Sequence, residues 1–429
     1  MKATIVQHHR HESKAAMCGC QPLPMIDHTA HHTLNAGMPI TGNRLGTIDE
    51  HMAHTPPRIA VIHDWLTANG GAERVLECML HCVPDADLFT LIDSGECLPP
   101  LIRARHRIVT SRLQKLPLAL RHYRRVAPLM PGAIEALDLR AYDLVLSSSW
   151  AFAHGVITPA HCRHLAYVHS PMRWAWDMED EYLDQAGLRG LLGRLARWQL
   201  ARLRRWDVQA AGRPDVLVAN SAFVAQRIRD CWHRPASVIY PPVTIAPQLP
   251  QAAAHGAYVS VSRLVPYKRV DLWVKAFAFL PDRQLIVAGD GPERERLQAM
   301  AGPNVRFVGR ITDREITELM AGARGFLQAS KEDFGIAVLE AQGCGTPVLA
   351  YGVGGAQETV RGLDQPQPTG MLFDTLDPEA AAQAVRAFER HRFMRQDCRM
   401  NAERFSPARF QSELVTAVNR LGFELAPPA

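Results

Sequence analysis

The 429-residue sequence lacks the long apolar run that a membrane-spanning helix requires. No stretch of about 18 consecutive uncharged apolar residues occurs, so we do not expect a helix to cross a membrane. The charged start, apolar core and cleavage site of a signal peptide are also missing. Aromatic residues make up 7% and apolar residues 47% of the chain. These fractions are typical of globular proteins, which argues against a largely disordered or fibrous chain.

Cysteine is scarce and scattered. The nine cysteines are odd in number, and no CxxC pair recurs with the spacing of zinc ligands. Cys78 and Cys82 lie one helical turn apart in an apolar pattern, which predicts buried thiols. This usage indicates a reducing, cytosolic compartment.

The charge of the chain is close to balanced. There are 48 Lys and Arg residues against 43 Asp and Glu residues, for a net charge of +5. That excess permits nucleic acid, an anionic membrane or a phosphorylated ligand as partner, and charge alone does not choose among them.

Residues 1–57 differ from the rest of the chain. They hold eight histidines and show no apolar periodicity, so we expect a disordered, His-rich extension without a fixed metal site. Met52 directly precedes the periodic region, and we take it as a candidate translation start.

From residue 58 onward, short apolar runs alternate with stretches of helical length. The pattern predicts two series of strands, at 58–63, 87–92, 143–148, 164–169 and 215–219, and at 257–262, 284–288, 305–308, 325–329 and 347–350. Such alternation indicates parallel sheets built from βαβ units. We therefore predict an α/β fold of two doubly wound, Rossmann-like domains facing a central cleft, with ligands at the carboxyl ends of the strands. The expected boundaries are 58–243 for the first domain, 244–256 for a Pro-rich linker, 257–405 for the second domain, and 406–429 for a helix (407–421) and tail.

The first strand is followed by a glycine pair, Gly70 and Gly71, before a helix expected to begin near Ala72. Glycines there let the backbone approach a phosphate, whose charge is met by the helix N-terminus. The segment departs from the dinucleotide fingerprint GxGxxG, but Asp93 lies where a ribose-binding acid would sit. A NAD-dependent oxidoreductase therefore stays open as an alternative.

The second domain opens with a strand followed by SRLVPYKRVD. Arg263 and Lys268 are five residues apart across a loop at the strand end, so both side chains can reach into a cleft. Arginine offers a bidentate fork and lysine a point charge, and together they can neutralise a diphosphate.

The segment KEDFGIAVLEAQGCGTPVLAYGVGGAQETV contains two spaced carboxylates. Glu332 falls in a strand-to-helix loop, Gly335 precedes the helix, and Glu340 lies about one and a half turns into it. A carboxylate at the helix mouth can hold sugar hydroxyls, and the deeper one can accept from a ribose. Because Glu340 sits in an otherwise apolar helix, it needs a partner or a ligand.

The pattern of Glu332 and Glu340, with Arg263 and Lys268 upstream, resembles the retaining family 4 glycosyltransferases of GT-B fold. The segments HDWLTANGGAERVLE, YDLVLSSSWAFAHGVI, YVHSPMRWAWD, VSRLVPYKRVD and EDFGIAVLEAQGCGTPVLAYGVGGAQETV are together similar to the WbaZ-type mannosyltransferases of O-antigen assembly. The resemblance covers roughly residues 58–422.

This resemblance implies a role for each matching residue. Arg263 and Lys268 would grip the donor diphosphate and stabilise it as a leaving group, and the backbone near Gly71 would touch the same phosphates. Glu332 would orient the transferred sugar and Glu340 the donor ribose. His169 would face the sugar and the acceptor. The resemblance further implies donor contacts from Phe334, Gly335, Ile336, Gly309 and Arg310.

The implied reaction is retaining transfer of a hexose, most simply mannose from GDP-mannose. No carboxylate is evidently placed to attack the anomeric carbon, so front-face departure and attack is the working mechanism. The DAD tripeptide at Asp85–Asp87 enters a strand far from the expected donor loops, which favours a structural role over metal binding. We expect a metal-independent enzyme without a cofactor, because a Lys–Arg pair can replace a metal.

The acceptor is suggested by the segment 188–207, where leucines recur at helical spacing among arginines. A basic amphipathic helix suits the inner face of an anionic membrane, where polyprenyl-diphosphate-linked saccharides reside. A helix packed on its own domain would give the same pattern. We expect a cytoplasmic enzyme of cell-surface polysaccharide synthesis that associates peripherally with the inner membrane.

Other functions fit the sequence less well. A nucleic-acid binder would use the net positive charge, but no helix-turn-helix, RRM or OB pattern is visible. A sugar-nucleotide 2-epimerase also has two such domains, but would not require Glu332 and Glu340 at this spacing. A UDP-sugar donor in place of GDP-mannose stays open.

Overall fold

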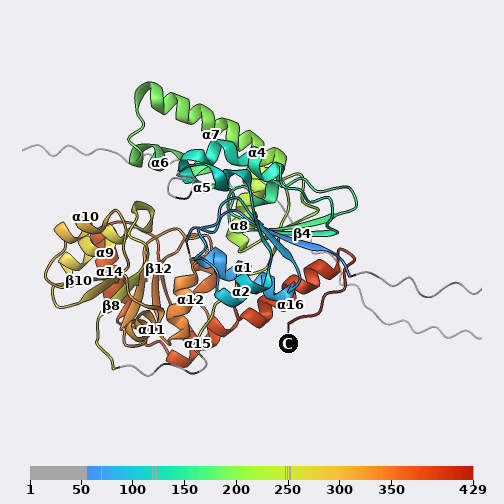
Figure 1. The fold of residues 1–429 in the computed structure, drawn as a ribbon. Coiled ribbons are helices and arrows are strands. Elements are labelled where there is room, and N and C mark those ends of the chain that lie inside the picture. Colours follow the sequence, from blue (N-terminus) through green and yellow to red (C-terminus); the bar gives the residue numbers. More distant parts are fainter. Residues whose placement is uncertain are drawn as a thin grey trace, which may run out of the picture. The chain divides into compact units, whose positions relative to one another are not determined.

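The computed structural model describes residues 56–428, apart from residues 69, 118–119, 121–122, 247, 249 and 251–252. All of these belong to one compact unit, Pro56–Ala429 (Figure 1). Most of the expected His-rich extension 1–57, including Met52, lies outside the described residues, as does part of the expected linker 244–256.

The first domain is built on a parallel sheet with the strand order β3-β2-β1-β4-β5-β6-β7. The strands are β1 Ile59–His63, β2 Asp87–Thr90, β3 Ile108–Thr110, β4 Leu144–Ser149, β5 Arg163–Val168, β6 Val216–Ala219 and β7 Ser237–Val238. The five predicted strands are confirmed to within two residues. The edge strands β3 and β7 are additions that sequence patterning missed, because two or three residues are too few to show a period.

Helices cover both faces of this sheet because its strands are apolar on both sides. Val61 packs on one face with α1 and α2, whereas Ala60 and Ile62 pack on the other, near α4. The helices are α1 Gly71–Cys82, α2 Pro100–Arg105, α4 Met130–Glu135, α5 Arg173–Trp176, α6 Glu179–Gln185, α7 Gly190–Ala210 and α8 Ala222–Trp232. The first helix thus begins within one residue of its predicted start.

The second domain has a parallel sheet of order β10-β9-β8-β11-β12-β13. The strands are β8 Tyr258–Val261, β9 Leu285–Ala288, β10 Val305–Gly309, β11 Gly325–Gln328, β12 Val348–Tyr351 and β13 Gly370–Phe373. Its helices are α9 Val270–Ala276, α10 Arg294–Ala299, α11 Asp313–Ala321, α12 Ile336–Gly343, α13 Ala356–Thr359, α14 Pro378–Phe388 and α15 Arg395–Glu403. The five predicted strands are again confirmed, and the edge strand β13 was missed. The predicted fold class, two Rossmann-like domains, is confirmed.

The last helix, α16 (Pro407–Asn419), returns to the first domain. The hydroxyl of Ser406 caps its start by accepting a hydrogen bond from the backbone N–H of Arg409. Phe410 and Leu414 pack in the same buried cluster as Met79 of α1, and Figure 1 shows α16 alongside α1. The predicted helix 407–421 is confirmed, and it completes the core of the first domain.

The two cysteines of α1 were expected to be buried thiols. Cys82 is buried and Cys78 half-buried on α1, and burial raises the pKa of these thiols to about 12 and about 11.

Among the described residues, no helix has both the length and the apolar composition needed to span a bilayer.

Candidate active site

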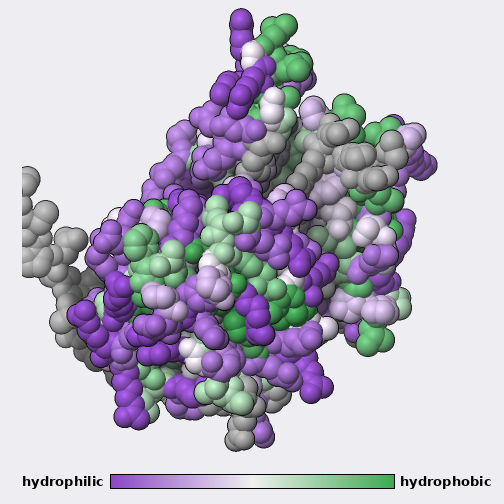
Figure 2. All heavy atoms as spheres, turned by 90° about the vertical axis from the view of Figure 1, so that its left-hand side faces the viewer, coloured by the Kyte–Doolittle hydropathy of each residue, from purple (hydrophilic) through white to green (hydrophobic). Residues whose placement is uncertain are grey.

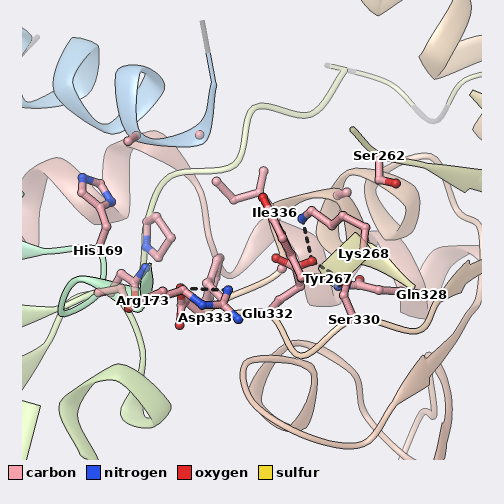
Figure 3. Close-up of a pocket in the computed structure, with 18 of the residues that line it drawn as sticks. His169, Arg173, Ser262, Tyr267, Lys268, Gln328, Ser330, Glu332, Asp333 and Ile336 are labelled. Carbon is pink, nitrogen blue, oxygen red and sulfur yellow. Dashed lines mark hydrogen bonds and ion pairs between the residues drawn. The ribbon is translucent and has the colours of Figure 1, made fainter. Parts of the chain in front are cut away.

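A cavity of about 510 Å³ is lined by residues from both domains. Trp150 and His169 follow β4 and β5 of the first sheet, and Ser262 and Ser330 follow β8 and β11 of the second. Figure 3 shows His169 and Arg173 on one side of this cavity, and Lys268, Glu332 and Ser330 on the other. The cavity thus lies at the carboxyl ends of the strands, where parallel α/β sheets bind ligands.

Two helices begin at this cavity. Gly71 is the first residue of α1, and Ile336 is the first residue of α12. A Cβ atom on Gly71 would lie 2.6 Å from Cδ1 of Ile336, so only glycine fits there without a shift. Gly335 caps α12 with a φ of 95°, a left-handed conformation that favours glycine. Two converging helix N-termini offer free N–H groups and positive dipole ends to an anion.

A lysine and a glutamate form an ion pair in the wall of the cavity. Nζ of Lys268 lies 2.6 Å from Oε1 of Glu332, and the hydroxyl of Ser330 also donates to Oε1. Burial opposes the ionised form of Glu332, but the charge and hydrogen bond of Lys268 outweigh it and lower the pKa of the carboxyl. Burial likewise opposes the charge of Lys268, but Glu332 outweighs it and raises the pKa of the ammonium. Both groups are therefore charged near neutral pH.

A second ion pair joins the two domains beside the first. Nη1 of Arg173 on α5 lies 3.5 Å from Oδ2 of Asp333, and its Nη2 donates to the carbonyl of Lys331 at 3.2 Å. Burial raises the pKa of Asp333, against the lowering effect of Arg173 and Arg227. The guanidinium of Arg173 also lies 5.7 Å from the centre of the Tyr267 ring.

His169 is the end of a buried polar chain behind the cavity. Its Nε2 lies 2.9 Å from Oγ of Ser148, which lies 3.1 Å from Nδ1 of His63. Nε2 of His63 is 3.8 Å from Oε1 of Glu73 on α1. Burial, with a smaller effect of His63, lowers the pKa of His169 to about 3. The imidazole of His169 is therefore neutral near pH 7.

The loop after β4 is held by one buried carboxylate. Asp64 accepts hydrogen bonds from the backbone N–H groups of four successive residues, Trp150 to Ala153, at 2.6–3.0 Å. Burial nevertheless raises the pKa of Asp64, because desolvation exceeds these four bonds. This arrangement positions Trp150, whose ring lies edge-on to His169 with centroids 5.9 Å apart.

The structure brings seven of the eleven predicted site residues into the cavity lining: Gly71, His169, Lys268, Glu332, Phe334, Gly335 and Ile336. Phe334 is almost fully buried and stacks on Tyr240, where the chain crosses between the domains. Its side chain therefore packs the crossing, and its backbone borders the cavity.

The other four predicted residues lie outside this lining. Glu340 pairs with Arg74 of α1, which supplies the partner that its apolar helix demanded. Arg263 lines a neighbouring cavity. Gly309 ends β10, with its Cα facing the guanidinium of Arg294, and Arg310 is exposed just beyond it.

Several lining residues were not singled out from the sequence, among them Trp150, Arg173, Tyr267, Ser330 and Asp333. Asp333 and Ser330 flank Glu332, and Arg173 follows the YVHSP segment of His169. Proximity in sequence to a predicted site residue was therefore the available signal.

Metal ligands do not gather in the part of the chain that the structure describes, where no cluster of three or more His, Cys, Asp or Glu side chains could hold an ion. Asp87 begins β2, accepts a short hydrogen bond from the hydroxyl of Tyr142 and lies 3.8 Å from Arg107. The DAD tripeptide thus stands at the amino end of its strand, away from the cavity at the carboxyl ends.

Two protein families match adjacent segments of the chain. Residues 69–246 match "Glycosyltransferase Family 4", and residues 248–405 match "Glycosyl transferases group 1". Together these matches cover both Rossmann-like domains.

Characterised relatives match over part of their length. The chain is 35% identical over 139 residues to a GDP-mannose-dependent monoacylated alpha-(1-6)-phosphatidylinositol monomannoside mannosyltransferase of Corynebacterium glutamicum, covering 27% of this chain and 36% of the relative. It is 26% identical over 233 residues to a GDP-Man:Man(3)GlcNAc(2)-PP-Dol alpha-1,2-mannosyltransferase of Xenopus laevis, covering 47% and 48%. The chain thus spans between about a third and a half of these relatives.

Among solved structures, sucrose-phosphate synthase from Thermosynechococcus elongatus superposes with a TM-score of 0.64. The sequence identity is 18%, and the alignment covers 85% of this chain and 99% of that structure. At this identity the match shows the shared two-domain GT-B fold.

Proposed function

The chain belongs to the family 4 glycosyltransferases, and on that basis we propose that it transfers a hexose from a nucleoside diphosphate sugar to a saccharide acceptor. The donor proposed is GDP-mannose, and the transfer retains the anomeric configuration. The observation that carries this proposal is the convergence of two helix N-termini, Lys268 and Glu332 on one cavity.

The cavity offers separate partners for the two halves of the donor. Breaking the bond between the sugar and the diphosphate leaves negative charge on the phosphate oxygens. The N-termini of α1 and α12 and the ammonium of Lys268 are fixed positive groups that stabilise this charge as it develops. Glu332, held by Lys268 and Ser330, is a charged acceptor for the hydroxyls of the transferred sugar.

The ion pairing of the cavity carboxylates favours a mechanism in which the acceptor attacks the sugar on the same face from which the diphosphate departs. Of the described residues that line the cavity, Glu332 and Asp333 carry the carboxylates, and each is committed to an ion pair, with Lys268 and Arg173. Neither is placed as a free nucleophile. In the proposed mechanism the acceptor hydroxyl therefore attacks beside the leaving diphosphate, whose oxygen takes the proton. The neutral His169 accepts a hydrogen bond from a sugar hydroxyl.

Isothermal titration with GDP, UDP and NAD tests the donor. Binding of GDP supports mannosyl transfer, and binding of UDP in its place would keep the reaction class but change the donor. Binding of NAD without either nucleotide would contradict the proposal. Incubation with GDP-[¹⁴C]mannose and a lipid extract then identifies labelled product.

We further propose a lipid-linked acceptor at the cytoplasmic face of a membrane, in cell-surface polysaccharide synthesis. The support comes from α7, where Leu191, Leu192, Leu195 and Trp198 are all more than half exposed. Beside them, four exposed arginines form no ion pair with any described residue: Arg189, Arg194, Arg202 and Arg205. In Figure 2 hydrophobic and hydrophilic surface interleave on the projection at the top, where Figure 1 places the start of α7. Apolar and cationic groups on one exposed helix suit an anionic bilayer surface.

Vesicle flotation tests this membrane contact. We expect flotation with vesicles containing phosphatidylglycerol and loss of flotation in Leu192→Gln/Leu195→Gln. Leu363→Gln changes an exposed leucine of the second domain and is the matched control. Equal flotation of all three proteins would contradict the proposed contact.

A further inference from the structure

A second cavity, of about 580 Å³, lies beside the first. Trp150, Trp174, Tyr182 and Tyr267 line both. We call it the aromatic cavity because Trp65, Tyr123 and Phe152 complete an aromatic wall, with Trp65 packed edge-on to Trp150 at a centroid distance of 5.3 Å. The two cavities are therefore adjacent, and these four side chains form their common border.

The rest of the aromatic cavity is mostly aliphatic, with Gln199 and Arg263 as the polar exceptions. Leu183 and Leu188 line it ahead of α7, and Ala196, Gln199, Leu200 and Leu203 line it from α7. Of the described residues in this lining, Arg263 carries the one charge, and it forms no ion pair with any described residue. The lining is therefore largely apolar and suits an apolar body with an anionic group at one position.

The same helix connects this cavity to the exposed apolar surface. Leu192 and Ala196 are one turn apart on α7, and Leu192 is 63% exposed whereas Ala196 lines the cavity. In the segment that leads into α4, Leu129 is 56% exposed between the lining residues Pro128 and Met130. Apolar side chains thus continue from the cavity lining to the surface in both segments.

From these features we propose that the aromatic cavity holds the hydrocarbon chain next to the anionic linkage of a lipid-linked acceptor. The chain lies along α7, Arg263 contacts the anionic linkage, and the acceptor saccharide reaches the first cavity past Trp150 and Tyr267. The inference rests on the proposed transfer to a lipid-linked acceptor, and it names the site and the chemistry of the lipid.

A chain-length series of prenyl monophosphates tests the site. Isopentenyl, geranyl and farnesyl monophosphate share one headgroup, and their dissociation constants are measured by titration of the full chain below their micellar concentrations. We expect affinity to rise at least about tenfold with each added isoprene unit, because each unit buries several methylene-sized groups. Equal affinity across the series would overturn the proposal.

Two variants on the same helix localise the effect. Leu200→Gln introduces a polar group into the lining and should remove most of the gain with chain length. Leu191→Gln changes an exposed leucine of α7 outside the lining and should keep the gain. An equal loss in both variants, or in neither, would contradict the proposed position.

Further titrations separate the possible failures. GDP binding, measured on each variant, reports an intact fold and the donor site. If wild-type protein shows the chain-length effect but binds no GDP, the proposed donor is wrong and the lipid site stands. If α-mannobiose displaces farnesyl monophosphate and Leu200→Gln weakens both equally, the cavity binds glycan and the proposal is wrong.

Discussion

Lys268 and Glu332 hold each other in position, with Nζ and Oε1 2.6 Å apart at the edge of the cavity. Each was expected to serve a different half of the donor, one the diphosphate and the other the sugar. Their contact places a fixed cation and a fixed anion where the bond between those halves would break. The pair is a pre-positioned unit, so changing either residue should affect both functions.

The first prediction concerns this pair. Glu332→Gln keeps the shape of the side chain but removes the charge that holds Lys268, so we expect kcat to fall about 100-fold or more. Lys268→Met should lower kcat similarly and also weaken GDP binding. Lys275→Met removes an exposed lysine from the helix that follows and is the matched control. Normal turnover in Glu332→Gln would contradict the proposed role.

The second prediction uses Gly71. In Gly71→Ala the new methyl would lie 2.6 Å from Cδ1 of Ile336, the end of a side chain that borders the cavity and can shift, so we expect a loss of about 1 kcal/mol of stability, the low end for overpacking, and a higher KM for the donor. Ile336→Val removes that Cδ1 atom. The double variant should therefore regain stability in urea unfolding. Gly132→Ala, where a Cβ meets nothing within 4 Å, is the control. Additive losses in the double variant would rule out the predicted clash.

A third prediction follows from the polar chain behind the cavity. Ser148 has one hydroxyl proton for two imidazoles, His63 and His169. Glu73 favours a proton on Nε2 of His63, so Ser148 donates to His63 and accepts from Nε2–H of His169. This leaves Nδ1 of His169 as an acceptor.

Nitrogen-15 NMR of labelled histidine measures that tautomer directly. Ser148→Ala should shift the His169 signals toward a mixture of tautomers and lower kcat about tenfold without changing GDP binding. Ser147→Ala, one residue earlier, breaks a contact with His164 and is the control. Unchanged His169 signals in Ser148→Ala would refute the assignment.

The fourth prediction concerns acid stability. Burial lowers the pKa of His164 from 6.5 to about 3. Below pH 6.5 the unfolded chain takes up a proton at this position that the folded protein does not, so stability falls as the pH falls toward 3. The loss is about 2 kcal/mol at pH 5.

Urea unfolding at pH 7 and pH 5 measures this loss. His164→Gln should reduce the difference between the two pH values, even if it lowers stability at both. His161→Gln, at an exposed histidine, should leave the difference unchanged. An unchanged difference in His164→Gln would show that other groups cause the acid sensitivity.

The fifth prediction is metal independence. The ammonium of Lys268 and the N-termini of α1 and α12 supply positive charge at the proposed diphosphate site, so activity should persist after dialysis against EDTA. Loss of activity in EDTA that magnesium or manganese restores would overturn this expectation.

Local sequence patterns were sufficient to predict most of the fold and part of the site. Strands of four to six residues with helices between them were predictable, whereas the edge strands β3 and β7, with three and two residues, are too short to show a period, and β13, with four residues, was missed as well. Lys268, Glu332 and Gly71 were predictable because each belongs to a loop beside a strand or helix end.

The remaining contacts depend on tertiary structure. Arg173 and Asp333 are 160 residues apart, and Arg74 and Glu340 are 266 apart, so no local pattern pairs them. Arg263 was predicted to share a site with Lys268 because the two residues are close in sequence. Successive turns of a loop can direct side chains into different cavities, and these two residues line different cavities.

The return of α16 to the first domain has a consequence for synthesis. Phe410, Leu414 and Val418 fill the same cluster as residues of β1 and α1, more than 300 positions earlier in the chain. The first domain leaves the ribosome first, but part of its apolar surface stays uncovered until the last helix has been synthesised. A shortened C-terminus would expose that surface and leave the earlier domain prone to aggregation, although every strand of its sheet is present.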